Sequence, residues 1–181
     1  MANLNVNICG VHFKNPAIAA SGTYGFGREF NEVYDISVIG GVSTKGTTLE
    51  ARLGNPVPRI AEGSSVILNA VGLQNPGVEH FIKDDLEFLK DKGVVVIANV
   101  AGSTLEDYKL ICRRLNGLVD MVELNISCPN VHAGGMALGI RPQNIKEVTQ
   151  LTKAELTKTP LIVKLSPNVE SIPVNAKAGE E

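Results

Sequence analysis

The sequence predicts an α/β protein built on a parallel sheet and, within that class, favours a β/α barrel of the (β/α)8 TIM type. After an opening hairpin, segments of strand and helix character alternate about five times along the 181 residues, an order that gives a parallel sheet with helices outside it. The strand segments are nearly continuous apolar runs, as in strands covered on both faces. A doubly wound sheet would also fit. The barrel is favoured because polar, glycine-bearing loops follow successive strands, and barrel active sites are built at that end.

Composition and charge exclude several classes of function. Hydrophobic residues make up 44% of the chain and charged residues 20%, which is ordinary for one soluble domain spanning residues 1–181. The net charge of −2 gives no reason to expect nucleic acid or an anionic membrane as a partner. Cys9, Cys112 and Cys128 are too far apart for a C-x-x-C pair or a disulfide framework, so a reducing, cytoplasmic location is expected. Neither a membrane-length apolar run nor a signal peptide is recognisable.

The chain opens with a predicted hairpin at residues 4–13, centred on Gly10. Residues 17–20 predict the first strand, which runs into the loop S-G-T-Y-G-F-G at 21–27. Its three glycines permit close approach of the backbone to a ligand. The loop is neither a G-x-G-x-x-G motif nor a P-loop, so this signal alone is weak. A short helix is expected over residues 28–36.

The second strand, residues 38–43, ends in T-K-G-T-T, where Lys45 stands just past a buried run. Because each strand so far ends in a polar, glycine-bearing loop, we interpret Lys45 as more than a solvated loop residue. Residues 52–63 contain two prolines and are expected to form an irregular connection to an amide- and glycine-rich loop at 69–77. Helical spacing of apolar residues then predicts a helix over 78–92.

The second half continues the alternation. Residues 94–98 predict the third strand, and Ser103 or Thr104 is expected to cap the next helix. Cys112 falls on the apolar stripe of that helix and is interpreted as core, and Cys9 as structural. The remaining elements are a fourth strand at 122–126, a helix at 143–153 with Ile145, Val148 and Leu151 facing inward, a fifth strand at 161–165, and a helical end at 176–181.

Two side chains stand out on chemical grounds. Cys128 follows the fourth strand, precedes Pro129 and comes three residues after Asn125, in a loop that also holds a glycine pair. A buried, inert thiol is the usual alternative for a free cysteine. The position at a strand end favours a chemical role. Lys164 interrupts the apolar run L-I-V-K-L, where a lysine is costly unless it is paired or functional.

Six segments carry a resemblance, and they are, in chain order, A-S-G-T-Y-G-F-G at 20–27, S-T-K-G-T-T at 43–48, N-A-V-G-L-Q-N-P-G at 69–77, I-A-N-V-A-G at 97–102, N-I-S-C-P-N at 125–130 and V-K-L-S-P-N at 163–168. Together they resemble the class 1 dihydroorotate dehydrogenases, flavin barrels of pyrimidine synthesis. The segment G-G-M-A-L-G at 134–139 is similar to the class 1B subgroup, which works with a separate electron-transfer subunit carrying FAD and a 2Fe-2S cluster and passes electrons to NAD.

The resemblance implies a role for individual residues. Cys128 would be the general base that removes a proton from C5 of dihydroorotate while a hydride leaves C6 for FMN. Substrate contacts are implied for Lys45, Asn69, Gly72, Leu73 and Asn125. Flavin contacts are implied for Ser21, Gly22, Lys45, Asn99, Asn125 and Lys164. No metal site is implied, and His132 is expected to be a solvated loop residue.

The resemblance also implies partners and leaves alternatives open. It implies dihydroorotate and orotate as substrate and product, a homodimer, and a heterotetramer with the iron–sulfur FAD subunit. A full barrel takes about 250 residues, so we expect a chain truncated at its C-terminus, ending in a clipped helix. One alternative is therefore an inactive remnant that retains subunit-association surfaces. Another is a related flavin-dependent dihydropyrimidine dehydrogenase.

Overall fold

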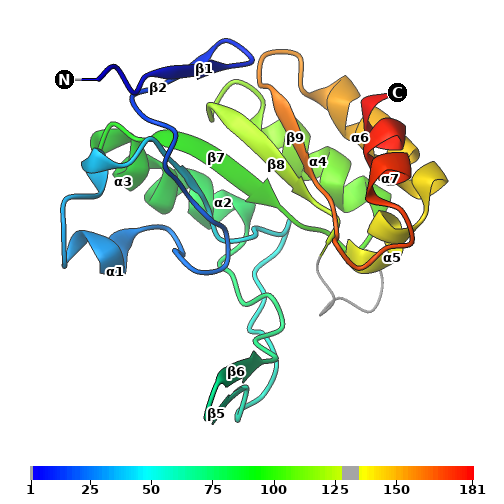
Figure 1. The fold of residues 1–181 in the computed structure, drawn as a ribbon, viewed down its shortest axis with the longest axis horizontal. Coiled ribbons are helices and arrows are strands. Elements are labelled where there is room, and N and C mark those ends of the chain that lie inside the picture. Colours follow the sequence, from blue (N-terminus) through cyan, green and yellow to red (C-terminus); the bar gives the residue numbers. More distant parts are fainter. Residues whose placement is uncertain (1, 128–134) are drawn as a thin grey trace.

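The computed structural model describes residues 2–127 and 135–181, with side chains in the second range from Leu138 onward. Its centre is a five-stranded parallel sheet whose strands stand in chain order (Figure 1). A doubly wound sheet reverses its strand order at a switch point, and these five strands show no reversal. The prediction of a barrel-type fold with about five of eight β/α units is confirmed. The strands are β3 (Ile18–Ala19), β4 (Gly41–Ser43), β7 (Val95–Val100), β8 (Met121–Asn125) and β9 (Leu161–Lys164).

Helices cover one face of the sheet, and the main hydrophobic core lies between the two layers (Figure 1). Val96 and Val122 project from the strands into this core, which also contains Ile111 and Val148 from the helices. The helical elements are α1 (Arg28–Asn31), η1 (Ile36–Val38), α2 (Val78–His80), η2 (Phe81–Asp85), α3 (Leu86–Asp91), α4 (Leu105–Leu115), α5 (Gly135–Ile140), α6 (Pro142–Glu155) and α7 (Ile172–Glu180). None of the helices in the described ranges combines the length and the apolar character needed to cross a membrane.

The predicted opening hairpin closes the other face of the sheet near its amino-terminal ends. Strands β1 (Val6–Ile8) and β2 (Val11–Phe13) pair antiparallel. The Phe13 ring is fully buried and packs in one cluster with Ile97 and Met121, which point inward from β7 and β8. Burying such a ring is worth roughly 2–3 kcal/mol. The hairpin therefore covers the amino-terminal part of the sheet's inner face with apolar side chains.

Residues 52–63 were predicted to be irregular throughout, and this is wrong at their end. Strand β5 (Ile60–Gly63) pairs antiparallel with β6 (Val66–Asn69), and the hairpin projects away from the body of the molecule (Figure 1). Every residue of both strands is exposed, including the consecutive apolar residues of V-I-L at 66–68. A strand with no buried face has no alternation in its sequence, so the usual signal was missing.

Three other predictions need correction. The helix expected over 28–36 ends at Asn31, because the Asp35 carboxylate accepts hydrogen bonds from the Ser37 backbone and hydroxyl and starts η1 instead. The strand that follows begins only at Gly41. In α6, Leu151 does not face inward but is 36% exposed. Thr152 is buried in its place, and its hydroxyl donates to the Val148 carbonyl at 2.7 Å.

Helix α4 bears out its sequence signals. Of the two residues predicted to cap it, Thr104 does so: its hydroxyl accepts from the Asp107 amide, and the Asp107 carboxylate accepts from the Thr104 amide. This reciprocal capping box satisfies two of the free amides at the helix start. Cys112 is fully buried, and burial raises the pKa of its thiol to about 12. The prediction that Cys112 is a core residue is confirmed. Cys9, interpreted as structural, is exposed in the turn of the opening hairpin.

Candidate functional site

A cavity of about 500 Å³ lies at the carboxyl ends of the strands, a volume typical of small-molecule sites. Residues from the loops after β3 and β4, from β6 and the loop after it, and from β8 and β9 converge on it. The structure thus brings together eight of the predicted site residues from five separate segments. The lining residues are Ser21, Gly22, Thr23, Lys45, Gly46, Ile60, Asn69, Val71, Gly72, Leu73, Asn125 and Lys164.

Asn99 does not line the cavity but lies directly behind it. Its side chain is fully buried, and its Nδ2 donates to Oε1 of Glu123. Its Oδ1 accepts from Nδ2 of Asn125 at 3.2 Å. The contact with Glu123 follows from strand register, since Asn99 and Glu123 are direct partners across β7 and β8 and their side chains share the inner face. Asn99 therefore reaches the cavity through Asn125.

The end of β8 is held in place from two sides. Oδ1 of Asn125 accepts hydrogen bonds from the Ser127 amide at 3.2 Å and the Ser127 hydroxyl at 2.9 Å. The Tyr108 hydroxyl, on the outer helix α4, donates to the Asn125 carbonyl at 3.0 Å. Cys128 and His132 lie outside the described residues. What the structure describes is the turn that leads to Cys128.

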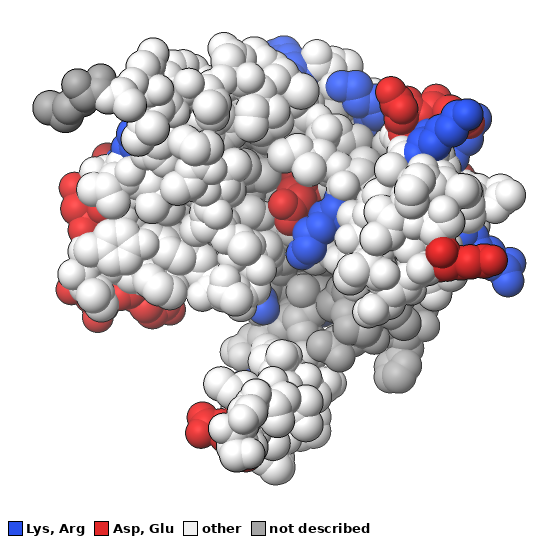
Figure 2. Space-filling view, viewed as in Figure 1, with Lys and Arg blue, Asp and Glu red and all other residues white. Residues whose placement is uncertain are grey.

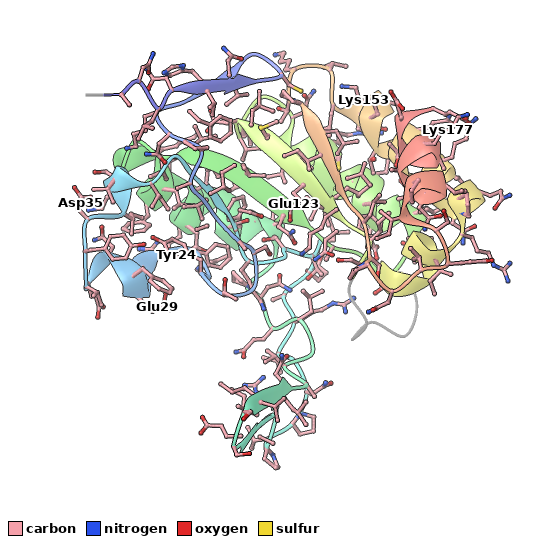
Figure 3. All side chains as sticks on the ribbon, in the orientation of Figure 1. Tyr24, Glu29, Asp35, Glu123, Lys153 and Lys177 are labelled. Atoms are coloured by element: carbon pink, nitrogen blue, oxygen red, sulfur yellow. The ribbon has the colours of Figure 1, made fainter. Side chains whose placement is uncertain are left out.

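Two lysines give the cavity its positive charge. Lys164 is half-buried on β9 and is the direct register partner of Asn125. Lys45 is half-buried at the end of β4, where its backbone amide donates to the Gly25 carbonyl at 2.9 Å. Neither ammonium group has a carboxylate within ion-pair distance in the part of the chain that the structure describes. Figure 2 shows an acidic and a basic group side by side near the middle of the molecule, and Figure 3 labels Glu123 in that region.

The loop after β6 presents its backbone in an unusual conformation. Gly72 and Leu73 both have positive φ, of 76° and 57°. A left-handed leucine costs of order 1–3 kcal/mol unless its surroundings impose it. The buried Asn75 side chain does so: its Nδ2 donates to the Leu73 carbonyl at 2.8 Å, and its Oδ1 accepts from the amides of Thr48 and Gly77. Asn75 thus ties this loop to the one after β4.

Asn69 and Asn75 differ in how they are held. Asn69 is exposed at the foot of the β5–β6 hairpin, opposite Ile60 in the register. Its place beside the cavity depends on that hairpin. Asn75 was not predicted to have a role of its own, although the amide-rich character of the loop was noted. The signal available was N-P-G, in which an asparagine side chain commonly bonds backbone amides two residues onward.

Glu123 was also missed, and here the sequence did carry a signal. It is the one acidic residue of the strand M-V-E-L-N, two positions before Asn125. Since strand side chains alternate between faces, Glu123 must share the inner face with Asn125. An acidic side chain on a covered inner face requires a hydrogen-bonding partner. That requirement alone would have singled it out.

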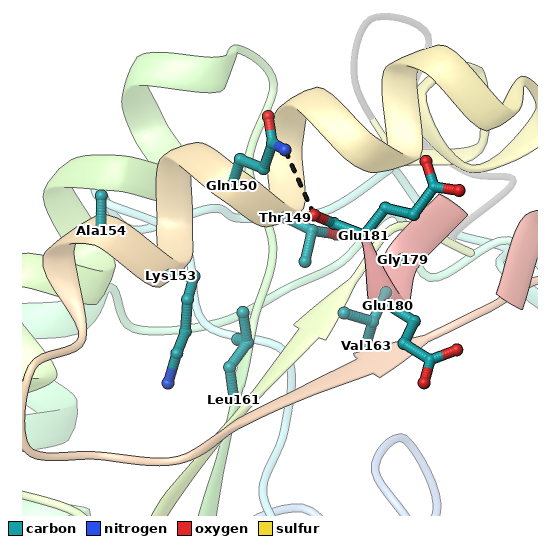
Figure 4. A pocket seen from close by; sticks show the side chains of 9 residues that line it. All are labelled: Thr149, Gln150, Lys153, Ala154, Leu161, Val163, Gly179, Glu180 and Glu181. Carbon is teal, nitrogen blue, oxygen red and sulfur yellow. Dashed lines mark hydrogen bonds between the residues drawn. The ribbon is translucent and has the colours of Figure 1, made fainter. Parts of the chain in front are cut away.

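Other groupings of chemical interest lie away from this cavity. A second cavity of about 510 Å³ lies between α6, β9 and the end of α7, and it contains none of the predicted site residues (Figure 4). Among the described residues, His80, Asp84 and Asp85 are close enough to share a cation. Arg28 instead contacts the carboxylates of both aspartates at 2.9 and 3.0 Å. Burial raises the pKa of Asp85, partly offset by that arginine.

Comparison with known proteins gives a consistent picture. The sequence model of the family described as dihydroorotate dehydrogenase matches residues 3–181. The chain is 50% identical over 178 residues to "Dihydroorotate dehydrogenase B (NAD(+)), catalytic subunit" of Caldicellulosiruptor bescii, covering 98% of this chain and 59% of that protein. The identically named protein of Alkaliphilus metalliredigens is 51% identical over 177 residues, covering 97% of this chain and 58% of that one. The chain thus spans somewhat under three-fifths of the length of these curated relatives.

Solved structures agree in fold. The crystal structure of DHODH from Eimeria tenella in complex with ferulenol superposes with a TM-score of 0.79 at 21% identity, covering 97% of this chain and 56% of that one. The ligand-free type of the same organism's protein gives a TM-score of 0.76, covering 95% and 56%. At this level of identity, the comparison supports the barrel-type architecture and nothing more specific.

Proposed function

Because the chain belongs to the dihydroorotate dehydrogenase family, we propose that the protein oxidises dihydroorotate to orotate in pyrimidine biosynthesis. The observation that carries this proposal is the cavity at the carboxyl ends of the strands, where segments from across the chain place two cations and two carboxamides together. Dihydroorotate offers matching groups: a carboxylate for a lysine, and ring N–H and C=O groups for carboxamides, which both donate and accept. We assign these contacts to Lys45, Asn69 and Asn125.

The residues that line the same cavity support FMN as the proposed cofactor. Lys164 supplies a cation without a carboxylate partner among the described residues, and Ser21 and Gly22 contribute to the wall. A side chain at Gly46 would come within 2.9 Å of Asn99 Oδ1 and 3.0 Å of Leu73 Cδ1, so the loop there has to stay small. Ser43, at the end of β4, has a buried hydroxyl without a hydrogen-bond partner among the described residues. When bound, FMN would supply the hydride acceptor, and Ser21, Gly22, Lys45, Asn125 and Lys164 would hold it. Asn99 would act from behind the cavity by holding Asn125.

Cys128 is the proposed general base, which takes the proton from C5 of the substrate. Support comes from its position one residue beyond Ser127, whose amide and hydroxyl are fixed by Asn125 at the edge of the cavity. Cys128 can take this proton only as its thiolate, so the site must favour the thiolate at neutral pH. A base in this position adds typically 10²- to 10⁴-fold to the rate.

The test is the rate of dihydroorotate oxidation by the protein produced from its complete coding sequence. Cys128→Ala should lower kcat by about 10²- to 10⁴-fold and leave the flavin absorbance of the purified protein unchanged. The exposed Cys9 provides a matched control, and Cys9→Ala should retain full turnover. Undiminished turnover in Cys128→Ala would remove the base assignment. A wild-type protein that binds flavin but oxidises another dihydropyrimidine instead would remove the substrate assignment.

We further propose that electrons leave through a partner subunit. Two relatives are named as catalytic subunits of NAD(+)-linked enzymes, which supports a separate partner subunit and NAD as the final acceptor. The FAD and the 2Fe-2S cluster of that subunit are proposed from the resemblance of the sequence alone. A homodimer of catalytic subunits within a heterotetramer, located in the cytoplasm, completes the proposal. Two results would support it: co-purification with an iron–sulfur flavoprotein, and dihydroorotate-dependent NAD reduction by the complex but not by the catalytic subunit without its partner.

A further inference from the structure

The carboxylate of Glu123 stands at one end of an unbroken chain of hydrogen bonds behind the cavity. Asn99 Nδ2 donates to Glu123 Oε1, Asn125 Nδ2 donates to Asn99 Oδ1, and the Ser127 amide donates to Asn125 Oδ1. The two carboxamides at its centre are buried, with Asn99 fully inaccessible and Asn125 7% exposed. We call this chain the amide relay.

The two ends of the amide relay determine its direction. A carboxylate can only accept hydrogen bonds, and a backbone amide can only donate one. A carboxamide, by contrast, can turn over and exchange its donor and acceptor ends. With an acceptor fixed at Glu123, Asn99 must present its NH₂ there and its oxygen to Asn125. Asn125 must then present its NH₂ to Asn99, which leaves its oxygen for Ser127.

We propose that Glu123 is a positioning residue, whose carboxylate fixes the direction of both carboxamides in the amide relay. Through them it holds the turn at Ser127, the residue that precedes Cys128. Without the carboxylate, the buried NH₂ group of Asn99 would have no acceptor. If the Asn99 carboxamide turned over instead, its NH₂ group would face the NH₂ group of Asn125. Buried donors without acceptors are costly, so the relay would rearrange and the turn would shift. The catalytic role of this turn rests on the proposed function, whereas the existence of the relay does not.

Two substitutions separate the direction of hydrogen bonding from charge. Glu123→Leu removes the acceptor and keeps a similar volume. Glu123→Gln removes the charge and keeps an acceptor oxygen for Asn99. The inference predicts that Glu123→Leu lowers kcat for dihydroorotate oxidation on the order of 100-fold, as a misplacement of about 1 Å can, and that Glu123→Gln restores at least about tenfold of this loss. Thr152→Val is the matched control, because it removes a buried hydrogen bond within α6, away from the cavity and the relay; its kcat should stay within about twofold.

A second readout does not depend on turnover. Hydrogen exchange of the side-chain amides of Asn99 and Asn125, measured by NMR on protein labelled with ¹⁵N-asparagine, should be slow in the wild type and in Glu123→Gln. It should be fast in Glu123→Leu. Should leucine prevent folding, Glu123→Met offers a flexible apolar side chain with the same expectation.

The outcomes are distinct. Equal losses of kcat in Glu123→Leu and Glu123→Gln would show that the charge matters and would overturn the inference. Slow exchange in the apolar variant would overturn it as well. A wild-type protein that does not oxidise dihydroorotate would remove the proposed function, while the exchange pattern would still decide on the relay.

Discussion

The inner face of the sheet has two ends that differ sharply. At the amino-terminal end, Ile97 and Met121 pack against Phe13 of the opening hairpin in an apolar cluster. Two residues further along the same strands, the inward positions are Asn99 and Glu123, which bond each other. Two residues advance a strand by roughly 7 Å. The inner face of β7 and β8 thus changes from apolar packing to hydrogen bonding between one pair of inward-facing residues and the next.

This difference shows how the chain separates stability from chemistry. At one end of the strands, apolar side chains stabilise the folded state because they are removed from water. Polar side chains at the other end are buried at a cost, which hydrogen bonds among themselves offset. The separation predicts that substitutions at the two ends affect different measurements. The following predictions refer to the protein produced from its complete coding sequence.

The largest effect on stability is expected at the apolar end. Phe13→Ala should lower the free energy of unfolding by about 3–5 kcal/mol, because it removes a fully buried ring and leaves a cavity. Urea denaturation measures this loss. At a temperature where the variant is folded, its affinity for orotate should match that of the wild type. A parallel loss of orotate affinity would show that the two ends are not independent.

An intermediate effect is expected at Asn75, at the polar end. Asn75→Ala should lower the free energy of unfolding by about 2–3 kcal/mol, because it leaves the Leu73 carbonyl and two buried amides without their partner. Orotate affinity should fall as well, since Leu73 loses the contact that imposes its left-handed backbone. The neighbouring exposed Gln74 is the control, and Gln74→Ala should change stability by less than about 0.5 kcal/mol. Unchanged orotate affinity in Asn75→Ala would contradict the link between this loop and the site.

The smallest effect on stability is expected at Lys164. Lys164→Met should leave the free energy of unfolding unchanged or raise it by less than about 1 kcal/mol, because it removes a half-buried cation that has no carboxylate partner among the described residues. The flavin content of the purified protein should nevertheless fall. Lys158→Met, at an exposed position, should alter neither quantity. A marked loss of stability in Lys164→Met would mean that Lys164 is a structural residue.

Much of the fold could be predicted because it is encoded locally. The apolar runs of β7 to β9 and the capping box of α4 each carry a signal within a few residues. The β5–β6 hairpin could not be predicted in this way, because none of its side chains is buried and its sequence has no period. The prediction for Leu151 was wrong for a related reason. Helical spacing places Leu151 on the border of the buried stripe, and only the packing of α6 determines whether Leu151 or Thr152 is buried.

The identities of the site residues could be predicted better than the contacts among them. The resemblance supplied Lys45, Asn69 and Lys164 one by one, and the cavity is where the structure brings them together. Asn99 and Glu123 lie 24 residues apart in sequence, and their contact depends on the register between β7 and β8. No local pattern encodes that register. Periodicity could still have placed Glu123 on the inner face beside Asn125.

The β5–β6 hairpin also limits how this part of the chain can vary in length. Asn69 faces the cavity because its strand pairs with β5 in one register, with Ile60 opposite Asn69 and Gly63 opposite Val66. A single residue inserted within either strand would turn the following side chains to the opposite face. Insertions and deletions are therefore compatible with the site only at the tip between Gly63 and Val66, or in matched pairs on both strands. A segment whose side chains are all exposed is in this way among the least free to change its length.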